Sequence, residues 1–184
     1  MRNPDRRIIF ASVIIAALAL VSFAQTEVRY PELPNFHQVN PQLYRGAQPK
    51  AGGINKLAAL GIKTIVNLRG EDDHTRAEAV AARDLGLRYF AVPMPGSSRP
   101  ADEQMQRVLA IINSPENQPV FVHCKRGADR TGTVIACYRI LKDCWTASQA
   151  KKEAEHYGMY WTESGMKDYI SDFYARQKID AGSN

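Results

Sequence analysis

The sequence has few of the residues that mark several common classes of protein. Its 184 residues include three cysteines, an odd number that cannot close a full set of disulfides. The histidines other than His123, which are His37, His74 and His156, show no metal-ligand spacing, so we predict neither a metal site nor a cofactor. Basic residues number 24 against 19 acidic ones, but they form no dense block, which argues against a nucleic-acid partner. Repeats and low-complexity tracts are absent, and the length suits one domain.

Long apolar runs are also scarce, and the one that exists lies at the N-terminus. The basic segment "MRNPDRR" is followed over residues 8–24 by "IIFASVIIAALALVSFA", which carries no charge. We predict that residues 1–24 are either a secretory signal cut after Ala24 or an uncleaved anchor, with membrane attachment through residues 8–24. Both alternatives place the rest of the chain outside the cytoplasm, in the periplasm or at the extracytoplasmic face of the inner membrane.

Strand and helix patterns alternate through the rest of the chain. Residues 25–35 are polar and rich in proline, and we predict a linker that leads into a domain over residues 36–178. Thr75 and Glu78 have the spacing of a capping box. This spacing predicts a helix that begins at Thr75 and runs to Leu85, with Val80 on its apolar side. Strands are predicted at 42–49, 62–69, 87–94 and 119–124, and further helices at 54–61, around 105–112, at 131–142, from 146, and around 166–173. We therefore expect an α/β fold, a single three-layer domain whose central, mostly parallel sheet is flanked by helices.

Two groups of side chains are expected to be structural. Cys137 and Cys144 lie seven residues apart on one predicted helix, too far to form a disulfide, and are expected to be small buried hydrophobes. For the aromatic residues of "HYGMYW", core packing beneath the last helix is favoured over a wall that contacts substrate. These residues are Tyr157, Tyr160 and Trp161.

The segment "FVHCKRGADRTG", residues 121–132, joins an apolar strand to a helix. Ligands of parallel sheets bind at such junctions, beyond the carboxyl ends of the strands. A tight loop of N–H groups that enters a helix N-terminus binds anions, and Gly127 and Gly132 allow the backbone to close tightly. The same dipoles, together with Arg130, favour the thiolate of Cys124, and Arg130 can grip two oxygens of an oxyanion. This arrangement suits in-line attack of sulfur on phosphorus.

The spacing H-C-x5-R-[ST]-G resembles the phosphate-binding loop of the cysteine-dependent protein-tyrosine and dual-specificity phosphatases. It is present as His123, Cys124, Arg130, Thr131 and Gly132. With "LYRGAQP", "LAALGIKTIVNLR" and "FAVPMP", the chain looks like the small atypical dual-specificity phosphatases of bacteria, plants and fungi. The resemblance implies that Cys124 is the nucleophile and that Arg130 binds phosphate. It also implies that Thr131 assists release of sulfur and that His123 helps to stabilise the thiolate.

The rest of the loop is predicted to bind substrate, through Lys125, Arg126, Gly127, Ala128 and Gly132. Two extra cations, Lys125 and Arg126, suit substrates with several phosphates, as in members of this family that act on phosphoinositides or inositol polyphosphates. The alternative is that these side chains are ordinary charges that face solvent. We therefore expect a monomeric phosphatase whose substrate is a phosphorylated protein or an inositol phosphate.

No pattern marks the general acid that would protonate the leaving oxygen. Asp129, inside the loop, is favoured because it lies near the phosphate whatever the neighbouring segments do. Asp102 is the alternative, although an acid at that position also complements a helix dipole. Asp72 and Asp73 are weaker candidates, and Arg69 beside them either contacts substrate or pairs with a carboxylate.

Two other functions are weighed against phosphatase activity. A rhodanese-like sulfur transferase also has a loop that starts with cysteine and cradles an anion, but it does not usually combine His-Cys with arginine and Thr-Gly at this spacing. A catalytically silent phospholigand-binding module would follow if no general acid were available. We rank the phosphatase first.

Overall fold

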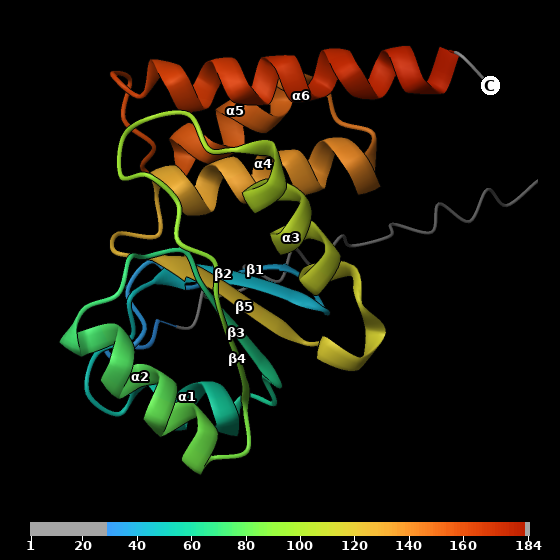
Figure 1. The fold of residues 1–184 in the computed structure, drawn as a ribbon. Coiled ribbons are helices and arrows are strands. Elements are labelled where there is room, and N and C mark those ends of the chain that lie inside the picture. Colours follow the sequence, from blue (N-terminus) through green and yellow to red (C-terminus); the bar gives the residue numbers. More distant parts are fainter. Residues whose placement is uncertain (1–28, 183–184) are drawn as a thin grey trace, which may run out of the picture.

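A five-stranded sheet forms the centre of the molecule in the computed structural model, which describes residues 29–182 (Figure 1). The strand order is β1-β2-β5-β3-β4, and β2, β5, β3 and β4 pair in parallel while β1 pairs antiparallel with β2. Their bounds are β1 His37–Asn40, β2 Leu43–Ala47, β3 Thr64–Asn67, β4 Arg88–Ala91 and β5 Val120–Cys124. The prediction of an α/β fold with a mostly parallel sheet is confirmed.

Helices cover both faces of the sheet and complete the three layers (Figure 1). One face carries α1 Gly53–Ala59 and α2 Asp73–Asp84. The other carries α3 Asp102–Asn113, α4 Asp129–Asp143, α5 Ala147–His156 and α6 Ser164–Gly182, and a 3-10 turn over Pro115–Asn117 precedes β5. None of the helices within residues 29–182 combines the length and apolar character that crossing a bilayer requires.

Successive residues of β5 face opposite layers, because side chains alternate along a strand. Val122 and Cys124 belong to the larger hydrophobic cluster, on the side of α3, α4 and α6. Phe121 belongs to the smaller cluster, on the side of α1 and α2, and the ring of His123 stacks on it with 5.5 Å between centroids. The side chains of Cys124 and His123 therefore lie in different environments.

The helix α2 begins earlier than the sequence predicted and presents a different face to the core. Its N-cap is Asp72, whose Oδ1 accepts a 2.8 Å hydrogen bond from the backbone N–H of Thr75, and the Thr75 hydroxyl bonds back to the N–H of Asp72. The predicted capping box of Thr75 and Glu78 is wrong. The face of α2 that packs on the domain therefore contains Thr75 and Glu78, which are buried, while Val80 is 51% exposed.

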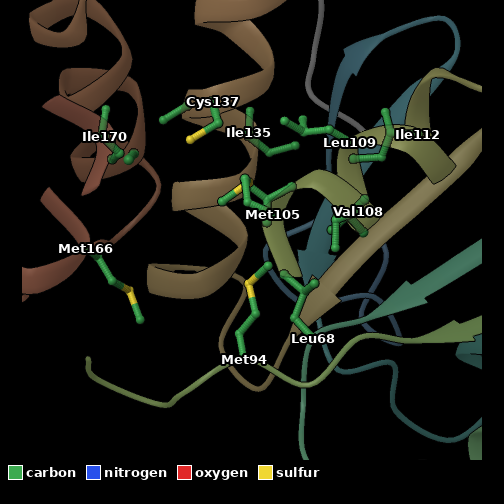
Figure 2. Close-up of a cluster of buried hydrophobic side chains, with 14 of the residues drawn as sticks. Leu68, Met94, Met105, Val108, Leu109, Ile112, Ile135, Cys137, Met166 and Ile170 are labelled. Carbon is green, nitrogen blue, oxygen red and sulfur yellow. The ribbon is translucent and has the colours of Figure 1, made fainter. Parts of the chain in front are cut away.

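The two cysteines of the α4 region differ in burial. Cys137 is fully buried among apolar side chains, including Met105 and Ile170 (Figure 2), and burial raises the pKa of its thiol well above the usual range. Cys144 is exposed and caps the C-terminus of α4 with φ 56°, so the prediction that it is buried was wrong. Helix α4 itself is central, as its apolar sequence predicted.

The segment before β1 packs on the domain. Leu33 is 2% exposed in the smaller cluster, and Tyr30 and Phe36 contact that cluster. The packed part of the domain thus includes residues before the predicted start at 36, within the stretch predicted as linker. The predicted signal or anchor segment, residues 1–24, lies outside the residues that the structure describes.

Candidate active site

The anion loop, residues 124–130, joins β5 to α4 and points its carbonyl oxygens away from its centre. Three of them accept hydrogen bonds from outside the loop: Lys125 from the N–H of Gln48 at 3.4 Å, Arg126 from Asn35 at 3.1 Å and Gly127 from Arg45 at 2.9 Å. In a trans peptide the C=O and the following N–H point in opposite directions. The N–H groups of residues 126–128 are therefore turned toward the centre, where an anion would accept their hydrogen bonds.

Gly127 lies directly against the backbone of β2. Its φ of 69° is in the left-handed region, which glycine adopts without strain. A Cβ at this position would lie 2.5 Å from the carbonyl oxygen of Gly46 and 2.6 Å from the nitrogen of Ala47. Gly46 in turn leaves room for the ring of Phe121, which a Cβ there would approach to 2.7 Å. Close contact between two backbones thus fixes the position of the loop.

Cys124 and Arg130 stand at the two ends of the loop. Cys124 ends β5 and is 2% exposed, while Arg130 lies in the first turn of α4 and donates from Nη1 to the carbonyl of Leu68 at 3.2 Å. Leu68 follows β3, and its N–H donates to the carbonyl of His123 at 2.9 Å, which ties the ends of β3 and β5 together. The hydroxyl of Thr131 is fully buried and has no hydrogen-bond partner within residues 29–182. A donor in that state suits the predicted assistance to a leaving sulfur.

His123 is held from the opposite face of the sheet. Its Nε2 lies 2.7 Å from Oε1 of Glu78 on α2, an ion-pair distance without hydrogen-bond geometry, and both side chains are buried. Its Nδ1 lies 3.3 Å from the carbonyl oxygen of Cys124. The other carboxylate oxygen of Glu78 accepts from Gln48, whose own oxygen accepts from Arg69 at 2.7 Å. A chain of polar side chains thus runs from Arg69 to His123, the residue before Cys124.

The carboxylate of Asp129 is engaged on both of its oxygens. Oδ2 accepts from the guanidinium of Arg126, and Oδ1 accepts from the backbone N–H of Tyr160 at 3.1 Å. The residue is 6% exposed. Two oxygens that both accept are arranged as in an ionised carboxylate, whereas a general acid must carry a proton. These contacts favour a role in shaping the loop, and the assignment of Asp129 as general acid stays a prediction.

Asp102, the alternative acid, binds side chains of α6. Its Oδ1 accepts from the hydroxyl of Tyr169 at 2.7 Å and from Arg176 at 3.0 Å. It therefore ties the start of α3 to α6.

The weaker acid candidates have structural partners as well. The backbone N–H of Thr75 lowers the pKa of Asp72, and this N-cap also pairs with Arg69, which favours its charged form. Asp73 is exposed and pairs with Arg76. Arg69 thus pairs with a carboxylate, one of the two roles predicted for it.

Glu163 is a carboxyl near the loop that the sequence did not single out. Burial and the charge of Asp129 raise its pKa, while the charge of Arg126 acts in the opposite direction. Its Oε2 is buried and has no hydrogen-bond partner within the described chain. A carboxyl in this environment keeps its proton to higher pH, as a general acid must.

Of the aromatic residues between α5 and α6, Tyr160 adjoins the anion loop. Trp161 is 84% exposed and Tyr160 is 54% exposed, so the prediction that they pack in the core was wrong. The guanidinium of Arg126 lies 3.9 Å from the centre of the Tyr160 ring. Met159 is the member of this segment that enters the core. The Tyr160 ring therefore lies at the surface beside the loop.

A buried cysteine, an inward ring of N–H groups and an arginine at the start of a helix form an anion site beside a thiol, an arrangement that suits phosphoryl transfer to sulfur. Comparison with known proteins gives the same class. Residues 12–170 match the family described as a DSP-PTPase phosphatase fused to NAD+ kinase. The chain belongs to this phosphatase family, and the predicted resemblance is confirmed.

The relatives include phosphatases of bacteria and plants. Dual specificity protein phosphatase TpbA of Pseudomonas aeruginosa is 33% identical over 135 residues, which are 73% of this chain and 59% of TpbA. Inositol diphosphatase DSP2 of Oryza sativa subsp. japonica is 31% identical over 130 residues, 67% of this chain and 61% of DSP2. A crystal structure of a TpbA variant in complex with pTyr matches with a TM-score of 0.65 and 25% identity, over 82% of this chain and 99% of that chain. The chain thus spans about three fifths of the length of these two relatives.

Proposed function

We propose that this chain is a cysteine-dependent phosphatase that hydrolyses its substrate through a phosphocysteine intermediate. The observation that carries the proposal is the anion loop, whose outward carbonyls turn the N–H groups toward a position beside Cys124. Membership of a phosphatase family supports it. This family membership favours a phosphatase over a sulfur transferase or a catalytically silent binding module.

The reaction has two steps. The thiolate of Cys124 attacks phosphorus and forms a sulfur–phosphorus bond, while the bond to the leaving oxygen breaks and that oxygen departs with its electron pair. Arg130 and the loop N–H groups stabilise the negative charge on the phosphoryl oxygens. Water then attacks phosphorus and loses one proton to solvent, while the sulfur–phosphorus bond breaks and the sulfur leaves as a thiolate beside the hydroxyl of Thr131. Inorganic phosphate is released, and the oxygen that departed in the first step takes up a proton from solvent.

The proposed substrates are those whose leaving group needs little protonation. Asp129, Asp102 and Asp72 are all occupied by other contacts, so an alkyl alkoxide would leave slowly unless another acid served it. The leaving group of an aryl phosphate is a phenolate. When the outer phosphoryl group of a diphosphate is transferred, the leaving group is the remaining phosphate. Both leaving groups are weaker bases than an alkoxide. The names of the relatives, a dual specificity phosphatase bound to pTyr and an inositol diphosphatase, support both classes.

The exported location also remains a proposal, supported by the order of basic, apolar and small residues over 1–24. Under that proposal the phosphatase acts in the periplasm or at the outer face of the inner membrane. Either location gives it substrates of an extracytoplasmic compartment.

The test is release of inorganic phosphate by the purified chain from a panel of substrates. The panel contains a phosphotyrosyl peptide, a phosphoseryl peptide, a phosphoinositide, an inositol phosphate and an inositol diphosphate. We expect turnover with the phosphotyrosyl peptide or the diphosphate, and none with Cys124→Ser, which should still bind vanadate through the loop N–H groups and Arg130. A serine variant that keeps a tenth of the activity would disprove the covalent mechanism.

A further inference from the structure

We propose that Arg45 is a positioning residue, which holds the anion loop from its closed side and keeps Cys124 ionised in the absence of a bound phosphate. The inference rests on the proposed function, because it concerns the same loop. Arg45 donates to an outward carbonyl of the loop, so its proposed action runs through Gly127 and through its charge.

The location of Arg45 is unusual for a charged residue. It lies in the middle of β2, flanked by parallel strand β5, and is 1% exposed. In the register of these strands Arg45 pairs with Val122 and Ala47 pairs with Cys124. Two residues along a strand and one strand across place the Cα atoms of Arg45 and Cys124 about 8 Å apart. Registered neighbours of parallel strands point to the same face, so the arginine shares the face of the thiol.

The contacts of Arg45 use part of its hydrogen-bonding capacity. Nη2 donates to the carbonyl of Gly127 at 2.9 Å, and the guanidinium lies 4.3 Å from the centre of the Tyr157 ring. Within residues 29–182, Nε and Nη1 have no hydrogen-bond partner although they are buried. Leaving donors of a buried cation unpaired is costly, and such a group calls for an explanation beyond stability.

The charge of Arg45 persists at neutral pH and is not cancelled by a direct ion pair. Burial lowers its pKa to about 10, against the attraction of Glu153, Tyr157 and Cys124, so the guanidinium remains a cation. The carboxylate of Glu153 is itself bound by Arg139 at 2.8 Å. The field of Arg45 is therefore available to the thiol.

The other charges around the thiol come from three elements. Arg130, on α4, stands where it can bind the phosphoryl oxygens, and Asp129 beside it is neutralised by Arg126. The pair of His123 and Glu78 lies on the opposite face of the sheet. Arg45 is thus a buried cation on the face of the thiol, and the loop carbonyl of Gly127 holds it in place.

Two substitutions separate charge from hydrogen bonding. Arg45→Gln removes the charge and keeps a shorter polar side chain with N–H donors, whereas Arg45→Lys keeps the charge. The assay is the rate of Cys124 alkylation by iodoacetamide as a function of pH, in a Cys144→Ser background because exposed Cys144 would also react. Buried Cys137 stays unreactive, and Cys124→Ser supplies the blank.

A unit charge about 10 Å away, at an effective dielectric constant of about 20, shifts an ionisation midpoint by roughly one pH unit. We therefore expect the midpoint of alkylation to rise by about one pH unit in Arg45→Gln and to stay near that of the parent in Arg45→Lys. A merely structural role would lower the melting temperature of both variants and leave both midpoints in place.

The outcomes distinguish this inference from the proposed function. If the parent midpoint lies at the pH of an ordinary thiol, the proposed function fails. If the parent midpoint is low and that of Arg45→Gln is equally low, the function stands and the role of Arg45 is wrong. Circular dichroism reports whether each variant folds. Should Arg45→Gln not fold, a rise of one unit in folded Arg45→Lys would overturn the inference, since its charge is retained.

Discussion

Replacing Gly127 with alanine tests whether contact between two backbones sets the position of the anion loop. The substitution adds one Cβ to a residue with φ 69°, next to the backbone of Gly46 and Ala47. No side chain of the site is removed. Any loss of activity therefore comes from the placement of the loop.

The size of the effect follows from the geometry. A Cβ in the left-handed region costs about 1–2 kcal/mol. The new atom would also lie 2.5 and 2.6 Å from two backbone atoms of β2, where ordinary contact begins at 3.4 Å, so the loop must move by about 1 Å. A misplacement of that size in a catalytic group lowers the rate by about 100-fold.

A matched control is Gly86→Ala, because Gly86 has φ 72° and a Cβ there would meet nothing within 4 Å. We expect the control to lose about 1–2 kcal/mol in free energy of unfolding, measured by urea denaturation, with unchanged kcat/KM. Gly127→Ala should lose more stability and about 100-fold in kcat/KM for an aryl phosphate. Activity of Gly127→Ala within threefold of the parent, or equal destabilisation of the two variants, would refute the reasoning.

Two further predictions concern the proton donor and the location. The variants Asp129→Asn, Asp102→Asn and Glu163→Gln each remove one candidate general acid. Only the variant that lacks the true acid should show a steeper dependence of rate on leaving-group pKa. General-acid catalysis typically contributes about 10² to 10⁴ in rate. We expect Asp129→Asn to lower the rate uniformly, as for a loop-shaping residue, and a steeper slope in that variant would restore it as the acid. A reporter that works only after export, fused after residue 30, should be active. An inactive export reporter, together with an active fusion to a second reporter that works only in the cytoplasm, would disprove the proposed location.

The sequence predicted the parts of the fold whose signal is local. The apolar strand that ends at Cys124 and the apolar helix α4 were predicted because continuous burial leaves a continuous apolar run. Strand β1 was not predicted, since "HQVN" is a short, mostly polar edge strand that gains its conformation by pairing with β2. The predicted start of α2 was wrong because the prediction made Thr75 the N-cap, whereas the structure uses Asp72 as the N-cap and Thr75 as its partner.

The part of the candidate site that was predicted is the part that one continuous segment of the sequence contains. The loop from His123 to Gly132 was found because its chemistry is contiguous. Glu78 was missed because it meets His123 only after α2 packs across the sheet. The general acid could not be assigned because the contacts of a carboxylate in the folded chain determine whether it can serve as an acid. One contact of Asp129 is the backbone N–H of Tyr160, which is distant in the sequence. A charged residue inside an apolar strand was the signal that could have identified Arg45.

The support of the anion loop through its carbonyl oxygens has a consequence for how this family can diversify. At Lys125 and Arg126 the backbone oxygens hold the loop in place, while both side chains are exposed. The side chain of Lys125 can therefore change in charge, size or polarity while the backbone of the loop keeps its support, whereas a change at Arg126 also removes the partner of Asp129. Affinity for the rest of a substrate can be altered by point mutation independently of the phosphoryl chemistry. A scaffold of this kind can acquire new substrates without rebuilding its catalytic centre.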